Sequence, residues 1–254
     1  MRRTERQAEI LQALADKGSV SVSELASRLS VSGETIRRDI KLLSDSGMLR
    51  RTHGGAVQPN PFEEPGFNQR LAKNSAAKKA IARLAAKQVQ NGDSIMLDTG
   101  STTAYVARAL LNHRDLLIVT NSADIARTLA TRRGNRVYMA GGELRADDGA
   151  SLGQSAAEFV RQFRVRLSII SIGAIDGDDG LMDYHLNEAE LSRAIIGRAE
   201  KCLVVADHSK FGQRGVVRVC GFDRIATLIS DRAPPPHFRD MMAGAGTEVL
   251  VASV

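Results

Sequence analysis

The sequence has 254 residues, 43% of them hydrophobic and 25% charged, the balance of a soluble globular protein with one large domain or two ordinary ones. No apolar run approaches the roughly 18 residues of a membrane span, and no apolar stretch typical of a secretory signal follows the basic first residues. We therefore expect a cytoplasmic protein without a membrane partner. Cys202 and Cys220, the two cysteines, form neither a disulfide framework nor a zinc pattern, so we expect no metal and no cofactor.

The net charge of +6 suggests an anionic partner, and the distribution of charge suggests where that partner binds. Residues 1–58 carry 10 Lys and Arg against 7 Asp and Glu, a net +3, so half of the excess charge lies in this short segment. The same segment has no Phe, Tyr or Trp, which disfavours the base stacking used to bind single-stranded nucleic acids.

Residues 59–70 are predicted to be a linker, because three of the six prolines lie there. Proline restricts both itself and the residue before it, so no regular helix is expected in this stretch. The chain is thus predicted to have a small domain over 1–58 and a larger one over 71–254.

The small domain is predicted to contain three short helices. The first covers about 3–16, and the second begins at a capping box in which Ser21 caps the helix and Glu24 reaches back. A three-residue turn leads to a third helix over 33–46, capped by Ser32.

The third helix has an apolar stripe of Ile36, Ile40 and Leu43, with basic residues on its far side. This pattern after a short turn is the plan of a helix-turn-helix, and Gly54-Gly55 after it predicts a basic hairpin, or wing. An ordinary solvated helix face would explain the arginines alone, but the stripe, the turn and the hairpin together favour DNA binding. The expected DNA contacts are Ser32, Thr35, Arg37, Arg38, Lys41, Arg50, Arg51 and His53.

The larger domain is predicted to be α/β, because apolar runs typical of strands alternate with helical segments. The strands are expected at 94–98, 116–120, 137–140, 167–172, 202–206, 225–229 and 248–251. The helices are expected at about 75–89, 103–111, 122–131, 154–163 and 187–200. This alternation predicts a mostly parallel sheet with helices on both faces, and ligands of such sheets bind at the carboxyl ends of the strands.

The loop from Asp98 to Ala104 offers a glycine, hydroxyl groups and free amides at the start of a helix, which together suit a phosphate. A plain helix cap without a ligand has the same appearance. Polar clusters also follow the next strands, which favours a real site for a small polar anion. The expected effector contacts are Asp98, Gly100, Ser101, Thr102, Thr103, Asn121, Arg145, Gly173, Asp176, Glu188 and Lys210.

Common catalytic and metal-binding motifs are absent from the sequence. The segment 176–180 resembles a calcium loop, but its glycine falls one position early and residue 187 is Asn where Glu is required. The five histidines are scattered, and no Gly-x-Ser-x-Gly elbow is present.

Taken together, the motifs resemble those of the DeoR-type bacterial transcriptional repressors along essentially the whole chain. The matching segments include 31–39, 51–56, 98–103, 120–122, 141–145 and 206–212. The resemblance implies a winged helix-turn-helix followed by a sensor domain that is similar in fold to ribose-5-phosphate isomerase and CoA transferases. Family members typically sense phosphorylated intermediates of sugar or polyol catabolism, and segments such as 109–113 and 183–185 indicate the members that regulate glycerol 3-phosphate metabolism.

We therefore expect a repressor of a carbohydrate or polyol catabolic operon. Its partners are expected to be double-stranded operator DNA and a phosphorylated effector, glycerol 3-phosphate or a sugar phosphate, that releases the DNA. One such module buries too little surface for operator specificity, so a homodimer or homotetramer is expected. The sequence does not determine the sign of regulation, and an activator or a corepressor-dependent repressor remains open.

Two alternatives belong to other functional classes. A sugar-phosphate isomerase-like enzyme with an accessory DNA-binding domain would use Asp98, Asp176, Glu188 and Lys210 for acid–base chemistry, although no clear catalytic pair is present. A nonspecific DNA-coating protein would bind in a manner that depends on salt and hardly on base sequence.

Overall fold

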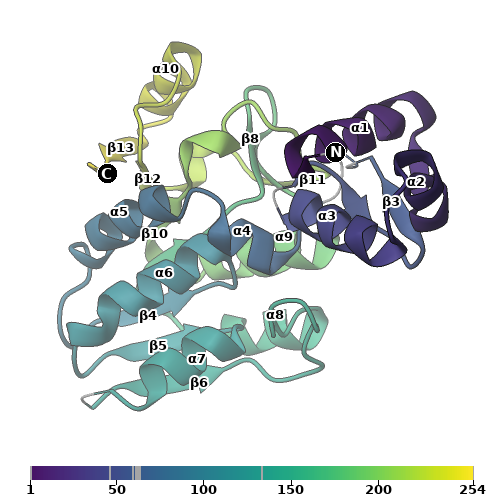
Figure 1. The fold of residues 1–254 in the computed structure, drawn as a ribbon. Helices are drawn as coiled ribbons and strands as arrows, with labels where there is room; N and C mark the ends of the chain where they lie inside the picture. The colour runs from purple at the N-terminus through teal and green to yellow at the C-terminus, as the bar shows by residue number, and fades with distance from the viewer. Residues whose placement is uncertain (1, 46, 59, 61–63, 133, 254) are drawn as a thin grey trace. The chain divides into compact units, whose positions relative to one another are not determined.

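The computed structural model describes residues 2–45, 47–58, 60, 64–132 and 134–253 of the chain, which forms two compact units, Met1–Pro65 and Gly66–Val254 (Figure 1). Positions 59 and 61–63 of the predicted linker lie outside the described residues. No helix in the described part of the chain is long and apolar enough to cross a membrane.

One expectation for the linker is wrong, because helix α4 (Phe67–Ala72) begins inside the stretch where no regular helix was predicted. The prolines of this stretch all precede Gly66. Their restriction acts on themselves and on the residue before each of them, so it ends at Pro65 and leaves the following residues free to form a helix.

The N-terminal unit has the three predicted helices and a three-stranded antiparallel sheet. The helices are α1 (Arg3–Lys17), α2 (Val22–Leu29) and α3 (Gly33–Asp45), and the strands are β1 (Ser19–Ser21), β2 (Arg50–Arg51) and β3 (Gly55–Val57). In the sheet, β3 lies between β1 and β2. The predicted stripe of α3 is part of a core with side chains of α1 and α2, such as Ile10 and Leu25.

Strand β1 was not predicted, and it changes the capping box expected at the start of α2. The hydroxyl of Ser21 accepts from the amide of Glu24 at 3.1 Å, as expected. The carboxylate of Glu24 does not reach back, however, but forms an ion pair with Lys17. Ser21 is thus both the N-cap residue of α2 and, through its pairing with Gly55, the last residue of β1.

The C-terminal unit is built on the predicted parallel sheet of seven strands. These are β4 (Ser94–Leu97), β5 (Leu117–Thr120), β6 (Arg136–Met139), β7 (Val165–Ile170), β10 (Ala199–Val205), β12 (Thr227–Ser230) and β13 (Glu248–Val251). They lie in the order β13-β12-β10-β7-β4-β5-β6 and every neighbouring pair is parallel. The strand order reverses between β4 and β7, and such reversals are where ligands of α/β sheets bind.

Helices cover both faces of this sheet. Successive residues of a strand point to opposite faces, so each strand contributes side chains to two cores. Ile95 and Leu97 of β4 pack in one core with α5 (Ser75–Ala86), α6 (Ser101–Ala109) and α7 (Ala123–Ala130). Met96, between them, packs in the other core with α8 (Gln154–Arg161), α9 (Leu186–Ile196) and α10 (Pro236–Gly244). Figure 1 shows α5 and α6 lying along the same side of the sheet.

The C-terminal unit also contains a second, smaller sheet, which was not predicted. It consists of β8 (Ala174–Asp176), β9 (Gly180–Asp183) and β11 (Val217–Cys220), all paired antiparallel. The segment 176–180, which resembled a calcium loop in sequence, is the turn of the β8–β9 hairpin, where Asp176 pairs with Gly180. Helix α10 was also missed.

Candidate nucleic-acid interface and anion site

The far side of α3 presents its basic side chains to solvent. Ile36 and Ile40 are buried, whereas the side chains of Arg37 and Arg38 are 66% and 79% exposed. Both arginines lie near Glu34, at 3.7 and 3.5 Å, so their charge is only partly balanced. Exposed pairs of this kind are weak and leave the guanidinium groups available to a stronger anion.

Ser32 and Thr35 shape the start of α3. The hydroxyl of Ser32 accepts from the amide of Thr35 at 3.2 Å and lies 2.9 Å from its hydroxyl. Ser32 therefore acts as the predicted helix cap. A phosphate contact by Ser32 would have to share a hydroxyl that already caps the helix.

The recognition-type helix is anchored by a buried ion pair that sequence analysis missed. Asp39 is 1% exposed and accepts from the Nε of Arg6 on α1, with Gln7 at 3.5 Å. A single acidic residue next to the apolar stripe of α3 was the available signal, since an isolated buried charge requires a partner. The pair joins α1 to α3 and fixes which face of α3 is exposed.

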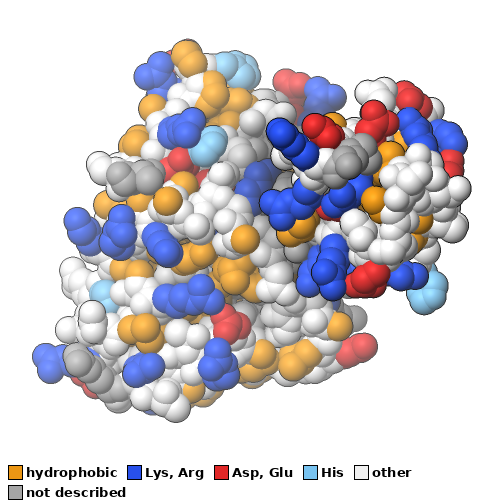
Figure 2. Space-filling view, in the orientation of Figure 1, with side chains coloured by type: hydrophobic (Ala, Val, Ile, Leu, Met, Phe, Trp, Pro, Cys, Tyr) orange, Lys and Arg blue, Asp and Glu red, His pale blue; other side chains and the backbone are white. Residues whose placement is uncertain are grey.

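A groove of about 650 Å³ lies between α3 and the hairpin. Five of the predicted DNA contacts line it: Arg37, Arg38, Lys41, Arg51 and His53. Arg50 is exposed on β2 and does not line the groove. Figure 2 shows lysine and arginine side chains gathered over α3. A basic groove between a helix and a wing has the shape and charge to hold a DNA backbone while the helix lies in the DNA major groove.

In the C-terminal unit, the loop after β4 ends at the open N-terminus of α6. Gly100 is the N-cap residue and no side chain caps the amides of Ser101, Thr102 and Thr103 in the described part of the chain. A Cβ at position 100 would lie 1.9 Å from the Oγ of Ser171, so the close approach of the two loops requires glycine. Free amides at a helix N-terminus favour a bound anion.

Asp98 and Asn121 hold this loop in place and have little capacity left for a ligand. Asp98 accepts from the amide of Ser171 at 3.0 Å, and burial raises the pKa of its carboxyl group well above the usual range. The Oδ1 of Asn121 accepts from the amide of Thr99 at 2.9 Å, and its Nδ2 donates to the carbonyl of Ser151. Both residues join the ends of neighbouring strands.

Arg145 is predicted to contact phosphate, and in the structure it lies between two carboxylates. Its guanidinium is 2.5 Å from Asp148 and 2.6 Å from Glu188. Burial of Asp148 is the largest influence and raises its pKa, but the hydrogen bonds and charge of Arg145, with the Ala150 amide and the charge of Arg70, together hold the pKa of Asp148 below its usual range. The ion pair brings the predicted residues Arg145 and Glu188 together, so an arriving phosphate would compete with Glu188 for Arg145.

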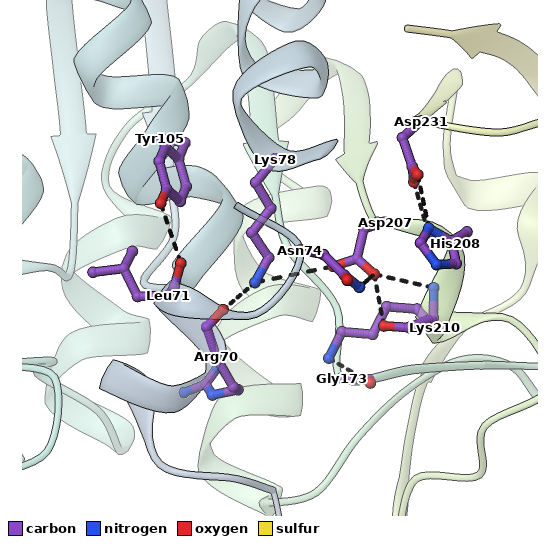
Figure 3. A network of polar contacts seen from close by, with 11 residues as sticks. Arg70, Leu71, Asn74, Lys78, Tyr105, Gly173, Asp207, His208, Lys210 and Asp231 are labelled. Carbon is purple, nitrogen blue, oxygen red and sulfur yellow. Dashed lines mark hydrogen bonds and ion pairs between the residues drawn. The ribbon is translucent and has the colours of Figure 1, made fainter. Parts of the chain in front are cut away.

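Lys210 and Gly173 are also brought together, because the Nζ of Lys210 donates to the carbonyl of Gly173 at 3.0 Å (Figure 3). Gly173 lies two residues after Ser171, the partner of Asp98. The loops that follow β4, β7 and β10 therefore meet at one edge of the sheet. This is the arrangement predicted from the polar clusters at the strand ends.

Asp176 is bonded within its own hairpin and to Arg214. Its carboxylate accepts from the amides of Asp178 and Asp179 and pairs with Arg214 at 3.3 Å. These amide hydrogen bonds lower the pKa of Asp176. Its chemistry is that of a turn residue in the β8–β9 hairpin.

A buried network behind the Lys210 loop was missed by sequence analysis. Asp207 accepts from Asn74 at 2.9 Å and from the Ser209 hydroxyl at 2.6 Å, and it lies 3.9 Å from the Nζ of Lys78 (Figure 3). Lys78 is 3% exposed, and burial lowers its pKa to about 8. Sequence analysis missed Lys78 because it lies in an alanine-rich helix segment, where a lysine normally faces solvent.

A basic winged helix-turn-helix joined to an α/β unit with an open helix N-terminus defines a DNA-binding regulator that carries a sensor domain. Residues 6–62 match the family described as "DeoR-like helix-turn-helix domain", and residues 73–232 match "DeoR C terminal sensor domain". The chain belongs to the DeoR family, and the resemblance in its motifs is thereby confirmed.

Two curated relatives match nearly the full length of the chain. The chain is 38% identical to the glycerol-3-phosphate regulon repressor of Escherichia coli (strain K12) over 236 residues, which are 93% of each chain. It is 35% identical to the HTH-type transcriptional repressor CsqR of the same strain over 246 residues, 97% of this chain and 94% of the relative. The named relatives are therefore transcriptional repressors.

Among solved structures, part of the chain is similar to ribose 5-phosphate isomerase A of Methanocaldococcus jannaschii. The match covers 55% of both chains at 17% identity with a TM-score of 0.40. This is a remote likeness of fold, from which nothing about activity follows.

Proposed function

We propose that this DeoR-family protein represses a carbohydrate or polyol catabolic operon and is released from its operator by a phosphorylated metabolite. The observation that carries the proposal is the pairing of a basic groove at α3 with an open α6 N-terminus on a second unit. The repressor names of both full-length relatives support it. Glycerol 3-phosphate is the first effector to test, because one of these relatives is named for it.

In this proposal α3 enters a DNA major groove. Thr35, Arg37 and Arg38 contact bases or nearby phosphates, and Lys41 contacts the backbone. Arg50, Arg51 and His53 of the wing contact the DNA backbone, and the two arginines add electrostatic attraction because each bound arginine releases a counterion from DNA.

The effector phosphate is proposed to bind the amides of residues 100–103, where the partial positive charge of α6 favours it. Lys210 and Arg145 lie on loops at the same sheet edge and supply cations. A phosphate that draws Arg145 away from Glu188 would change the contacts of the 145–150 loop. Such a difference between the two states is what an effector needs in order to shift DNA affinity.

We propose a regulator and not an enzyme, because both full-length relatives are named as repressors and the candidate carboxylates have structural partners. Asp98 holds the Ser171 amide, Asp176 caps a turn and Glu188 pairs with Arg145. Isomerase turnover by the purified protein on ribose 5-phosphate would contradict this part of the proposal.

Operator titration tests the function directly. Labelled DNA from upstream of the protein's own operon is titrated at fixed salt with excess competitor DNA, with and without glycerol 3-phosphate and common sugar phosphates. We expect specific binding that one phosphorylated compound weakens by about 5- to 150-fold, the range of ordinary allosteric coupling. Equal affinity for operator and competitor would indicate a DNA-coating protein instead.

We also propose that the protein acts as a homodimer or homotetramer on repeated half-sites, because one winged domain buries too little surface for operator specificity. Sedimentation of the protein with and without operator measures the subunit number. A monomer bound to a single half-site with full affinity would contradict the proposal.

A further inference from the structure

Helix α4 is the first element of the C-terminal unit after the linker, and its side chains are at most half-buried. It has six residues, and none of them is buried. A helix this short is unstable by itself in water, so its position depends on its contacts with the rest of the unit. Three side chains from other elements bond to its backbone.

The first anchor is at the start of α4. The carboxylate of Asp147 accepts from the amide of Phe67 at 2.7 Å. Asp147 lies in the loop that carries Arg145, next to Asp148, which pairs with that arginine. The N-terminal end of α4 is thus bonded to one of the proposed effector loops.

The second anchor comes from α6. The hydroxyl of Tyr105 donates to the carbonyl of Leu71 at 3.1 Å (Figure 3). Tyr105 lies one helical turn from Ser101, at the end of α6 where the effector phosphate is proposed to bind. Any shift of α6 on ligand binding therefore acts directly on α4.

The third anchor comes from Lys78 of α5, which donates to the carbonyl of Arg70. The same ammonium group pairs with Asp207, three residues before Lys210 on the loop after β10. Figure 3 shows Lys78 between Arg70 and Asp207, so it connects α4 with the Lys210 loop.

We propose that α4 transmits effector occupancy from the sensor domain to the linker. This inference rests on the proposed function. Two anchors come from elements that carry proposed phosphate contacts, the Arg145 loop and α6, and the third, Lys78 of α5, pairs with Asp207 of the Lys210 loop. Because these anchors bond the backbone of α4 to those elements, a change in the elements changes the position or order of α4, and with it the point where the linker leaves the unit.

The test separates effector binding from its transmission. Tyr105→Phe and Asp147→Ala, alone and together, remove two anchors at positions that are not proposed to touch the effector. Tyr138→Phe and Asp240→Ala, on β6 and α10, are the matched controls. For each full-length protein, the affinity for glycerol 3-phosphate is measured by calorimetry. Operator affinity is then measured with and without glycerol 3-phosphate. If the operator titration identifies another phosphate ester as the effector, that compound is used as the probe in both measurements.

We expect the double variant to bind the probe within about two-fold of the wild type, while the effect of the probe on operator affinity falls from the roughly 5- to 150-fold of ordinary coupling to less than about three-fold. The controls should keep the full effect. Hydrogen exchange of the 66–73 peptide should change with the probe in the wild type and not in the double variant.

Full coupling in the double variant would overturn the inference and leave the proposed function intact. Loss of probe binding in that variant would also overturn it, because the anchors would then belong to the ligand site itself. If the wild type shows no response of operator binding to any phosphate ester, the proposed function fails first.

Discussion

At the scale of single residues, Lys78 is an ammonium group almost fully removed from water. Burial is the main reason that its pKa is lowered from 10.5 to about 8; the charges of Lys210, Arg70 and Lys73 add to this and Asp207 opposes it. A shift of this size corresponds to a cost of about 3 kcal/mol for keeping the buried lysine charged. The network around Lys78 therefore makes the stability of the C-terminal unit depend on pH.

The sign follows from proton binding. Between about pH 8 and 10.5 the unfolded chain keeps the Lys78 proton and the folded chain does not, so the free energy of unfolding rises with pH across this window. Relative to Lys78→Met, which cannot titrate, the wild type should gain up to about 3 kcal/mol between pH 7.5 and 10.5, measured by urea unfolding followed by circular dichroism. Parallel pH curves for the two proteins would show that burial does not shift this lysine.

The side chain of Arg38 on α3 is 79% exposed and lines the basic groove. Arg38→Ala should weaken operator binding by about 1–3 kcal/mol, the usual worth of a good arginine–base contact, and leave effector affinity unchanged. Arg239→Ala, on α10, is the matched control. Unaltered operator affinity in the Arg38 variant would show that α3 is not part of the DNA interface.

At the scale of elements, the Arg6–Asp39 pair fixes α1 against α3. Removing one partner of a buried pair leaves an uncompensated charge, so Arg6→Ala should destabilise the N-terminal unit by about 3 kcal/mol. The exposed Glu9–Arg28 pair, at 3.2 Å, is the matched control, and Glu9→Ala should cost under about 1 kcal/mol. Thermal unfolding compares the two variants, and equal losses would show that the buried pair contributes no more than a surface pair.

The loop that starts α6 tolerates no side chain at position 100, where a Cβ would lie 1.9 Å from the Ser171 hydroxyl. Gly100→Ala should therefore displace the loop after β4, destabilise the unit by about 1–3 kcal/mol and weaken binding of phosphate esters. Gly244→Ala is the control, because a Cβ at that position of α10 meets nothing within 4 Å. Phosphate-ester affinity that survives in Gly100→Ala would place the anion site elsewhere.

At the scale of the whole molecule, we propose that the N-terminal unit supplies an electrostatic surface for DNA and the C-terminal unit supplies the ligand site. Replacing both Arg50 and Arg51 with Ala should reduce the slope of log affinity against log salt by roughly 2 for each bound subunit. The affinity for all DNA sequences should fall together, because wing contacts to phosphates carry little base information. Paired Ala substitutions at Arg132 and Arg239 should leave the slope unchanged; an equal loss there would indicate a nonspecific charge effect.

Periodicity and turn residues in the sequence were sufficient to predict the three N-terminal helices, the hairpin and the seven strands of the parallel sheet. These elements are determined locally, since an apolar stripe or run must be buried and glycine or proline ends it. Motif likeness was sufficient for the DeoR family. The short strand β1 and the small sheet of β8, β9 and β11 were missed, because three- and four-residue strands exist only through pairing with distant partners.

Within the candidate site, the sequence by itself determined which loops carry polar residues at the carboxyl ends of strands. Only the tertiary structure decided how those residues are used: Asp98 supports a neighbouring loop, Arg145 lies between two carboxylates and Asp176 belongs to a turn. It also decided that Lys78 and Asp39 are buried. The physical reason is that hydrogen bonds and ion pairs join residues far apart in the chain, and burial depends on which elements pack together, neither of which a local pattern encodes.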